Sequence, residues 1–503
     1  MATRRTAREV IDLLVDAGTW QSWDTPPDQG VISPHYAEEL AAAAVRSGAD
    51  ESVITGEGLV HGRRIAVLVG EFGFLAGSVG RAAGERLTTA IERATAERLP
   101  LLAATASGGT RMQEGTPALV GMTMITAALV AHRRAHLPYL VYLRDPTVGG
   151  VMASWGSLGH VTAAEPGALV GFLGPRVYKA IFGEDFPEGV QTAENLHRCG
   201  LIDAVIPLEQ LADEVDRVLN VLVGHMESLL PDPGLDPEDS VSDADLLPDI
   251  PAWDLITRSR NPERPGIRRL LKYGATDVVR LQGTGEGEHD PGLVLALARF
   301  GGAPCVFLGQ DRRGQSEENP MGPAALAAAR RGVRLSRQLG LPLVTLIDTR
   351  GAALTKEAEE RGLAGEIART LADIIDLSSP TISVLIGEGT GGGALALVPA
   401  DRMISAQHGW LSPLPPEGAS AIVHRTTSRA PEMAAAQGVR AKDLLARGIV
   451  DHVVVEHPDA ADEPEEFCRR MGRVLSHELL KLMAMDPQER YAARLLRLRH
   501  LGE

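Results

Sequence analysis

The chain has 503 residues, of which 44% are apolar, 23% are charged and only 4% are aromatic, a composition that argues against a disordered or fibrous protein. Because one hydrophobic core stops growing at roughly 250 to 300 residues, this length predicts two domains. Asp and Glu outnumber Lys and Arg by 66 to 50, and the formal charge of -16 disfavours nonspecific binding to nucleic acid or anionic membranes.

The three cysteines, Cys199, Cys305 and Cys468, are far apart and odd in number. This pattern supports neither a disulfide framework nor a cysteine zinc site, and it indicates a reducing compartment. The N-terminal sequence MATRRTAREVIDLL lacks an apolar signal core, and no stretch is long enough to span a bilayer. We therefore expect a cytoplasmic protein.

Strand-like and helix-like segments alternate along both halves of the chain. Residues 65–72 (IAVLVGEF) predict a strand, 84–99 a helix, 169–174 (LVGFLG) a further strand, and 323–339 (PAALAAARRGVRLSRQL) a second long helix. Such alternation is typical of a layered α/β unit with a largely parallel sheet.

An internal repeat relates the two halves. The run LPLLAATASGG at 99–109 recurs as LPLVTLIDTRG at 341–351, Gly149-Gly150 recurs as Gly392-Gly393, and CGLIDAVI around Asp203 recurs as RGIVDHVV around Asp451. The three landmarks keep their order and nearly the same offset in sequence number, which indicates two domains of one fold.

A segment rich in Pro, Asp and Ser separates the repeats. It reads LLPDPGLDPEDSVSDADLLPDIPAW and has few periodic apolar positions, which predicts a solvated linker. We accordingly expect an N-terminal domain over residues 1–228, an acidic Pro-rich linker over 229–260, and a C-terminal domain over 261–503.

In each half, strand-like sequence runs twice into glycine and then into helix-like sequence. These places are Ser107-Gly108-Gly109 and Gly149-Gly150 in the first half, and Gly351 and Gly391-Gly392-Gly393 in the second. Backbone N–H groups at such turns can stabilise a developing oxyanion, although a single glycine pair is as readily explained by a tight turn or by close helix-strand packing. Recurrence in both halves favours the oxyanion interpretation.

Several long segments resemble a known family. Residues 74–87 (FLAGSVGRAAGERL), 104–119 (ATASGGTRMQEGTPAL), 145–177 and 186–206 resemble the β subunit of the bacterial acetyl-CoA carboxylase carboxyltransferase. The second half resembles the α subunit of that enzyme through IDTRGAALTKEAEERGLAGEIARTL, VLIGEGTGGGALALVPADRMIS and SPLPPEGASAIVHR. The chain is therefore similar to a fused β-α carboxyltransferase, and the resemblance covers most of residues 10–225 and 295–455.

The resemblance implies two tandem crotonase-like domains of the α/β class. It also implies transfer of a carboxyl group from carboxybiotin to the α-carbon of a short acyl-CoA such as acetyl-CoA or propionyl-CoA, with the freed biotin nitrogen as the base. Both half-reactions develop an oxyanion, so two sets of donors are needed. By the same resemblance Gly149 and Gly150 serve the acyl-CoA thioester oxygen, and Gly392, Gly393 and Ala394 serve the biotin ureido oxygen.

Other residues carry weaker predictions. Gly108, Gly109 and Arg111 match the turn that the family places near the acyl-CoA channel, so we expect them to bind substrate, although pairing of Arg111 with Glu114 or helix capping explains it equally well. Glu388 is expected to be a buried structural carboxylate that accepts backbone hydrogen bonds.

Histidines do not form a recognisable ligand pattern in the sequence. His160 and His408 each stand alone without ligand spacing, and we expect surface or internally satisfied polar roles for both. No metal is expected in this chain.

The sequence departs from the family at some positions. No cysteine precedes Cys199, so the four-cysteine zinc ribbon common in the β subunit is not expected. Arg350 stands where the α subunit has proline in DTPG, which predicts a different turn, and Ala396 is expected near the acyl pocket without selecting one acyl chain.

Partners follow from what the sequence lacks. There is no Ala-Met-Lys-Met biotin-attachment sequence and no Gly-rich ATP-binding segment. We expect biotin to arrive on a separate biotin carboxyl carrier protein loaded by a separate biotin carboxylase, and the resemblance implies a homodimer or larger homo-oligomer. Two alternatives stay open: an acyl-CoA decarboxylase of the malonyl-CoA type, and a non-catalytic subunit that binds CoA or acts as a scaffold.

Overall fold

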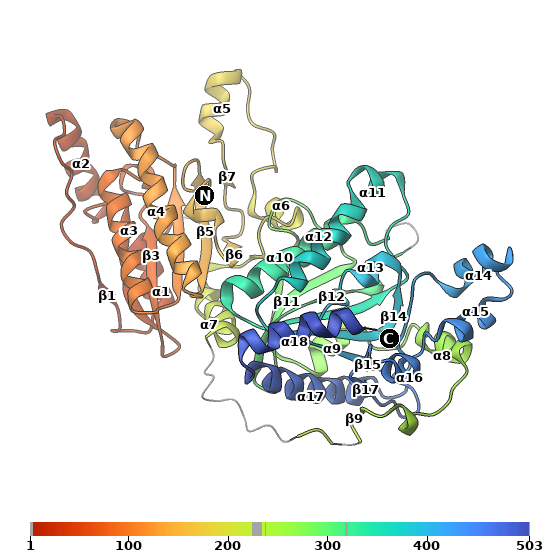
Figure 1. The fold of residues 1–503 in the computed structure, drawn as a ribbon. Coiled ribbons are helices and arrows are strands. Elements are labelled where there is room, and N and C mark those ends of the chain that lie inside the picture. Colours follow the sequence, from red (N-terminus) through yellow and green to blue (C-terminus); the bar gives the residue numbers. More distant parts are fainter. Residues whose placement is uncertain (1–3, 224–233, 237, 317–319, 502–503) are drawn as a thin grey trace. The chain divides into compact units, whose positions relative to one another are not determined.

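A computed structural model describes residues 4–223, 234–236, 238–316 and 320–501. The chain divides into two compact units, the first formed by residues 1–223 with 285–287 and the second by 224–284 with 288–503. Each unit is a layered α/β structure, which confirms the predicted fold class (Figure 1).

The first unit is built on one sheet with the strand order β1-β2-β3-β4-β5-β6-β8, and β7 pairs with β5. From β3 onward neighbouring strands are parallel, whereas β2 is antiparallel to β3. The strands are β1 (Gln21–Ser22), β2 (Val53–Val60), β3 (Arg63–Gly70), β4 (Leu101–Ser107), β5 (Tyr139–Val148), β6 (Val161–Ala164), β7 (Val170–Gly171) and β8 (Ala204–Val205).

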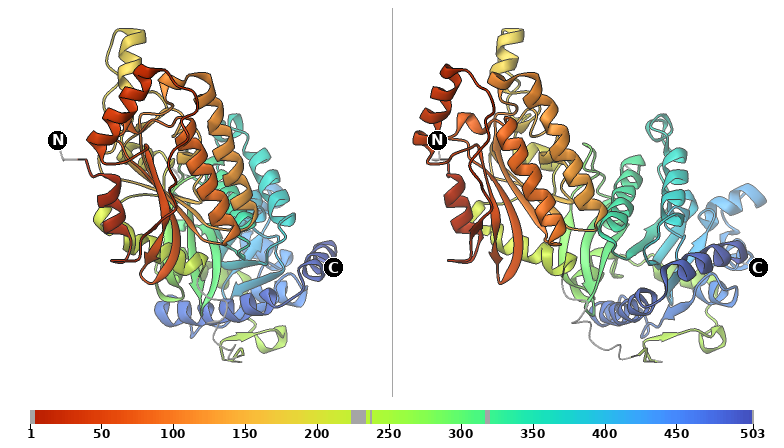
Figure 2. Two further views of the ribbon diagram at one scale, coloured as in Figure 1. Left: turned by 90° about the vertical axis from the view of Figure 1, so that its left-hand side faces the viewer. Right: turned by 60° about the vertical axis from the view of Figure 1, so that its left-hand side comes forward.

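Two long helices, α3 and α4, lie side by side on one face of this sheet (Figure 2). Their apolar sides form a core with alternate strand residues such as Leu68, Leu101 and Val141. The helices are α1 (Ala7–Leu14), α2 (Pro34–Ser47), α3 (Arg81–Ala96), α4 (Thr116–Arg134), α5 (Pro175–Phe182), α6 (Ala193–Arg198) and α7 (Leu211–Leu222). The short 3-10 turns are η1 (Leu75–Gly77), η2 (Met112–Glu114), η3 (Trp155–Ser157) and η4 (Leu208–Gln210).

The sheet of the second unit has the order β10-β11-β12-β13-β14-β15-β17-β9, and β16 pairs with β14. The strands β12, β13, β14, β15 and β17 are mutually parallel. The strands are β9 (Ser240–Val241), β10 (Thr276–Leu281), β11 (Leu293–Phe300), β12 (Ala303–Gln310), β13 (Leu343–Thr349), β14 (Thr381–Thr390), β15 (Arg402–Ala406), β16 (Trp410–Ser412) and β17 (His452–Val454).

Helices cover both faces of this second sheet. Gly332 of α10 lies against Leu308 and Val306, whereas the alternate residues Phe307 and Cys305 belong to the core that α9 and α17 cover. The helices are α8 (Ala252–Ser259), α9 (Ile267–Tyr273), α10 (Pro323–Leu339), α11 (Lys356–Glu360), α12 (Leu363–Ile375), α13 (Gly391–Leu395), α14 (Pro416–His424), α15 (Ala430–Gln437), α16 (Ala441–Ala446), α17 (Pro464–Met483) and α18 (Pro487–His500), with 3-10 turns η6 (Ala244–Leu246) and η7 (Arg312–Gly314).

The two units repeat the same strand order, and the strand ladders set the register of the repeat. Ser107 pairs with Thr147 in the first unit, and Thr349 pairs with Gly389 in the second. The ladders therefore align Thr349 with Ser107 and Gly389 with Thr147. On this alignment the counterpart of Gly149 is Gly391, so the pairing of Gly149 with Gly392 that the sequence suggested is one position too far along the chain.

Part of the predicted linker over residues 229–260 is folded. Residues 229–233 and 237 lie outside the described residues, but β9 adds an edge strand to the second sheet by pairing with β17. Helix α8 packs in a cluster with Trp410, Ala434 and Val439. Apolar residues such as Leu255 and Ile256 at helical spacing explain why this part of the segment is not solvated.

No described helix is both long and apolar enough to cross a bilayer. Cys199, Cys305 and Cys468 are all unpaired thiols in the structure, and Cys305 and Cys468 are buried.

Candidate functional site

Two glycine turns of the first unit meet at the carboxyl ends of β4 and β5. Gly109 has φ of +109° and Gly149 has φ of +63°, both in the left-handed region where glycine is favoured. A Cβ on Gly109 would lie 3.2 Å from the nitrogen of Gly150 and 3.3 Å from the Cα of Gly149. The two turns therefore touch through their backbones, and a side chain on Gly109 would separate them.

The second of these turns presents unpaired backbone donors. The N–H of Gly149 donates to the carbonyl of Phe172 at 2.9 Å, and a helical turn is closed by the N–H of Ala153 donating to the carbonyl of Gly149 at 3.0 Å. Among the described residues, the N–H groups of Gly150 and Val151 have no hydrogen-bond partner. Val151 is buried and Gly150 is half-buried, so two adjacent backbone donors are free to bind an acceptor such as a developing oxyanion.

The corresponding turns of the second unit follow β13 and β14. Gly351 has φ of +123° and Gly391 has φ of +63°. The N–H of Gly351 donates to Oγ1 of Thr349 at 3.1 Å, as the N–H of Gly109 donates to Oγ of Ser107 at 3.0 Å in the first unit. An equivalent hydroxyl therefore fixes the equivalent turn in both units.

Helix α13 begins directly after β14, at the first of the three consecutive glycines. The side chain of Thr390 does not cap this helix, because its Oγ1 donates to the carbonyl of Thr349 at 3.3 Å. The first N–H groups of an α-helix have no partner within the helix. The glycines at 391–393 thus offer donors at the place where Gly150 and Val151 offer theirs.

The sequence paired Gly149 with Gly392 and Gly150 with Gly393, but the strand ladders pair each with the glycine one position earlier. Gly391, with the same φ as Gly149, takes the place of that residue, and Gly392 takes the place of Gly150. Gly393 and Ala394 follow inside α13 and are buried. The carbonyl of Gly393 accepts a hydrogen bond from Nε2 of Gln310 at 2.7 Å, which ties α13 to the end of β12.

A further segment supports the first-unit site, although we did not single it out as functional from the sequence. Leu75 and Ala76 have φ of +44° and +57°, which is strained backbone for residues other than glycine. The carbonyl of Ala76 accepts the N–H of Gly108 at 2.8 Å, and the N–H of Val79 donates to the carbonyl of Gly109 at 2.9 Å. The glycines of FLAGSVG were the available sequence signal for this segment.

Arg111 is fully buried and supports the turn from behind. Its guanidinium donates to both carboxylate oxygens of Glu51 at 2.6 and 2.7 Å, to Oγ of Ser52 at 3.1 Å and to the carbonyl of Ser78 at 2.7 Å. Neither Arg111 nor Glu51 has an exposed side chain, so this arginine has no surface through which to touch a ligand. The structure therefore places Arg111 in the framework of the turn, and its main partner is Glu51, with Glu114 farther away at 3.5 Å.

Two buried carboxylates lie at the carboxyl edge of the second sheet. Asp348 accepts the N–H of Glu388 at 3.3 Å, and one oxygen of each carboxylate lacks a hydrogen-bond partner among the described residues. Burial raises the pKa of both carboxyl groups. Glu388 is held by Arg260, at 3.3 Å, and by the exposed Arg350, at 3.8 Å, and not by the backbone donors that the sequence led us to expect.

These charges distinguish the two halves of the repeat. In the register of the strand ladders, Asp348, Arg350 and Glu388 correspond to Ala106, Gly108 and Pro146 in the first unit. The second turn is therefore bordered by ionisable groups that the first turn does not have, which gives the two sites different electrostatic surroundings.

The sequence-based expectation of a surface or internally satisfied role holds only in part for His160, because its buried Nε2 has no hydrogen-bond partner among the described residues. It is 1% exposed, and its Nδ1 accepts the backbone N–H of Tyr139 at 3.0 Å. Burial lowers the pKa of His160 to about 3.

His408 does not stand alone as its sequence context suggested. Its Nδ1 lies 2.8 Å from Glu456 and 3.1 Å from Asp459, both of which follow β17 in the chain. The three groups could together ligate a cation. However, Arg264 donates to Glu456 at 2.6 and 2.8 Å and to Asp459 at 2.9 Å, and so occupies the oxygens that a cation would need.

Ala396 is fully buried in an apolar cluster with Leu326, Ala353, Ala358 and Leu363. Its small side chain therefore packs in a cluster with residues of α10, α11 and α12. It does not face an open pocket.

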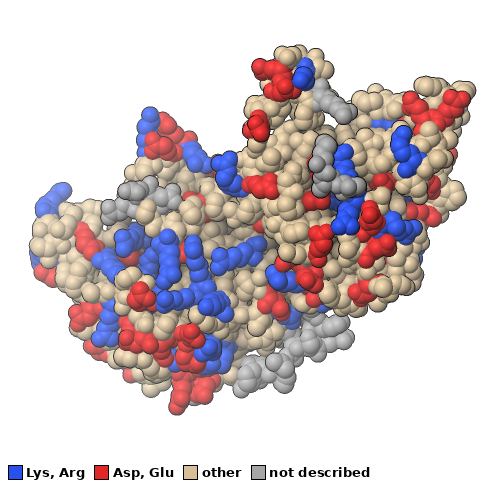
Figure 3. All heavy atoms as spheres, turned by 180° about the vertical axis from the view of Figure 1, so that it is seen from behind, with Lys and Arg blue, Asp and Glu red and all other residues tan. Residues whose placement is uncertain are grey.

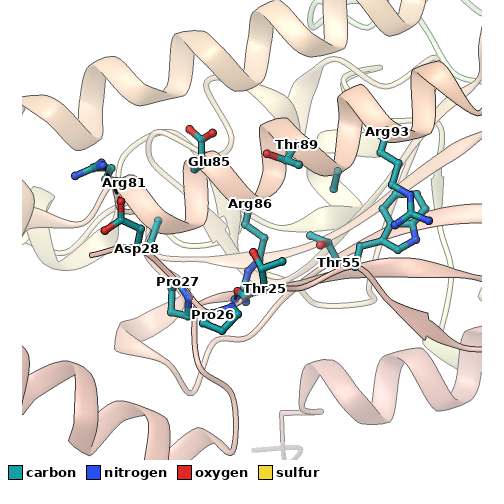
Figure 4. A pocket seen from close by; sticks show the side chains of 13 residues that line it. Thr25, Pro26, Pro27, Asp28, Thr55, Arg81, Glu85, Arg86, Thr89 and Arg93 are labelled. Carbon is teal, nitrogen blue, oxygen red and sulfur yellow. Dashed lines mark hydrogen bonds and ion pairs between the residues drawn. The ribbon is translucent and has the colours of Figure 1, made fainter. Parts of the chain in front are cut away.

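A cavity of about 450 Å³ lies elsewhere in the first unit, between residues 23–28 and helix α3 (Figure 4). None of the predicted site residues lines it. Its arginines are already paired, since Arg81 binds Asp28 at 3.2 Å and Arg93 lies 4.4 Å from the centre of the Trp23 ring. We therefore place the candidate site at the glycine turns and not in this cavity.

Comparison with known proteins identifies the family of the chain. Residues 2–491 match the family model described as the carboxyl transferase domain. The chain is 55% identical over 500 residues, 99% of each chain, to a probable biotin-dependent acyl-coenzyme A carboxylase beta3 subunit of Mycobacterium tuberculosis. It is 37% identical over 487 residues, 93% of this chain and 84% of the other, to the acetyl-coenzyme A carboxylase carboxyl transferase subunits beta/alpha of Salinispora arenicola.

Among solved structures, the chain resembles transcarboxylase 12S, which was crystallised as a hexamer with methylmalonyl-coenzyme A and methylmalonic acid bound. The TM-score is 0.73 at 20% identity, and the match covers 96% of this chain and 91% of the other. At this identity the likeness concerns the fold, and it confirms the two predicted crotonase-like domains.

Proposed function

The chain belongs to the carboxyl transferase family and is the carboxyltransferase component of a biotin-dependent acyl-CoA carboxylase, and from this premise we propose its reaction in more detail. It moves a carboxyl group from carboxybiotin, carried on a separate protein, to the α-carbon of a short acyl-CoA such as acetyl-CoA or propionyl-CoA.

The observation that carries this proposal is the pair of equivalent turns with unpaired N–H groups, one in each unit. Two donor sets suit a reaction in which negative charge develops on two different oxygens. The donors are fixed in advance by their turns, so little reorganisation is needed when charge develops. A reaction in which charge develops on only one oxygen would need only one such turn.

Each turn has its own task in the proposed reaction. In the first unit the N–H groups of Gly150 and Val151 receive the thioester oxygen as the acyl-CoA loses its α-proton, and Gly109 and Gly149 keep the two turns in contact. Gly108 belongs to the same turn, and Arg111 positions it from behind.

The second unit receives the ureido oxygen of biotin. Carboxybiotin supplies the carboxyl group and, once this has left, a basic nitrogen. The glycines at 391–393 provide the backbone donors, and the absence of side chains at these positions keeps the approach open. Ala394, which the resemblance also implied, is the fourth residue of α13, where the N–H is used in the hydrogen bonding of the helix. A Cβ on Gly393 would lie 3.2 Å from the nitrogen of Ala352 and 2.8 Å from Cε of Met321, so a larger residue at this position would disturb the turn.

The reaction requires partners and assembly. We propose a separate biotin carboxylase and a biotin carboxyl carrier protein, because no biotin-attachment sequence occurs in the chain. A homo-oligomer is supported by the hexamer of transcarboxylase 12S, which shares the fold.

The test is transfer of labelled carboxyl from a carboxylated carrier protein to acetyl-, propionyl- and longer acyl-CoA, measured separately for each. We expect transfer to a short acyl-CoA, and no release of CO₂ from malonyl-CoA unless carrier or biotin is present. Release of CO₂ without any biotin would instead assign the chain as a decarboxylase. A folded chain that binds CoA but transfers nothing would assign it as a binding or scaffolding subunit.

A further inference from the structure

A basic surface lies on the second unit, outside the glycine turns. Arg268 on α9 lines two adjoining hollows, one shared with Arg313 after β12 and one shared with Arg280 on β10. The second hollow has a volume of about 210 Å³. Lys and Arg side chains gather on the face of the molecule that Figure 3 shows, although the chain as a whole is strongly acidic. We call Arg268, Arg280 and Arg313 the arginine surface.

Among the described residues, one arginine of this surface is paired with an acidic neighbour and the other two are not. Asp311 and Asp348 are buried, and Asp290 accepts the N–H groups of Gly292 and Gly322 at 2.8 and 2.9 Å. Arg268 pairs with Asp311 at 2.5 Å. Within the described part of the chain, the exposed guanidinium groups of Arg280 and Arg313 have no partner.

The arginine surface borders the second glycine turn. Arg312, next to Arg313, lies 3.5 Å from Asp348 at the end of β13. Shortly after Arg313, Gln315 accepts a hydrogen bond from Oγ1 of Thr349 at 2.8 Å, and this hydroxyl holds the N–H of Gly351. The arginine surface and the turn therefore lie at the same edge of the second sheet, at the carboxyl ends of β12 and β13.

We propose that the arginine surface docks an acidic face of the biotin carrier protein while its biotin occupies the second-unit turn. This inference rests on the proposed function. A protein with a formal charge of -16 repels an acidic partner over most of its surface, so a local positive area determines where that partner approaches. Complementary charges of this kind act mainly on the association rate and on specificity, and they are screened by salt.

The test compares two double variants with the same change in net charge. Arg280→Glu with Arg313→Glu alters the docking surface without removing an ion pair from the described structure. Arg46→Glu with Arg499→Glu changes two exposed arginines on α2 and α18, and serves as the matched control. Each is assayed in the full chain with the biotin carrier protein that supports wild-type turnover, and separately with free biotin.

For the docking variant we expect the KM for the carrier to rise about tenfold at low ionic strength, while the KM for acyl-CoA and the activity with free biotin stay unchanged. The rise should shrink in about 0.5 M salt, because the screening length then falls to a few ångströms. The control variant should stay within about twofold of wild type.

An unchanged KM for the carrier, or a rise that the control variant shares, would overturn the docking inference. An equal loss with free biotin would also overturn it, because the arginines would then act within the site. The proposed function fails in a different way, namely if the wild-type chain transfers no carboxyl group from any carboxylated carrier.

Discussion

Replacing Gly150 by alanine tests whether the unpaired donors of the first turn are the catalytic feature. Gly150 does not have a positive φ, so alanine is acceptable to the backbone and the effect must come from contacts. The added Cβ would lie 2.6 Å from Oγ1 of Thr110 and 3.7 Å from Cε of Met122.

The size of the effect follows from these distances. Real Cβ atoms essentially never approach closer than 3.0 Å, so either the turn or the Thr110 side chain must move to admit the new atom. Strain of this kind costs about 1–3 kcal/mol of stability. Because a misplacement of about 1 Å at a reacting centre lowers rates about 100-fold, we expect kcat for carboxyl transfer to fall about 10- to 100-fold.

The structure also offers a rescue. Thr110→Ala removes the oxygen that the new Cβ would meet, so the double variant should recover most of the lost kcat, while Thr110→Ala alone stays within about threefold of wild type. Gly84→Ala in α3 is the matched glycine control, because its Cβ would have no atom within 4 Å.

Transfer of labelled carboxyl from carrier to acyl-CoA gives kcat and KM for each variant, and circular dichroism confirms that each is folded. Wild-type kcat in Gly150→Ala would refute the assignment of this turn. A folded double variant that remains as slow as the single one would refute contact with Thr110 as the cause of the loss.

Three further predictions concern other parts of the two units. Arg111→Met leaves the Glu51 carboxylate buried without its partner and should lower the free energy of unfolding by about 3–5 kcal/mol in a urea titration, whereas a raised KM for acyl-CoA at unchanged stability would mean that Arg111 binds substrate. In Gly351→Ala the new Cβ has space, because the nearest atom, Oγ1 of Thr390, is 3.5 Å away. The backbone φ of +123° should nevertheless lower the free energy of unfolding by about 1–3 kcal/mol, and an unchanged thermal midpoint would contradict this. Burial alone would lower the pKa of His408, but its hydrogen bonds with the carboxylates beside it outweigh burial and raise the pKa above the usual value of about 6.5. The stability that wild type gains over His408→Gln should therefore be full below about pH 6.5 and decline as pH rises through the folded pKa; a difference that grows with pH in urea titrations would contradict the sign.

The sequence by itself predicted the two α/β halves, their repeat and the positions of the glycine turns. These features are local: the spacing of apolar residues follows the helix or strand period, and glycine marks the places where the backbone takes a positive φ or makes a close approach. Gly109, Gly149 and Gly351 show this directly, because each has a positive φ at the carboxyl end of a strand. The similarity of whole segments to one family was likewise visible in the order of residues.

Only the tertiary structure decided which residues are partners. Arg111 pairs with Glu51, which precedes β2, and His408 meets two carboxylates that follow β17, and neither pairing follows a period that a sequence pattern reveals. The one-position correction that aligns Gly391 with Gly149 likewise came from the strand ladders. The physical reason is that long-range contacts depend on sheet register and on the packing of distant elements, which local periodicity and turn chemistry leave open.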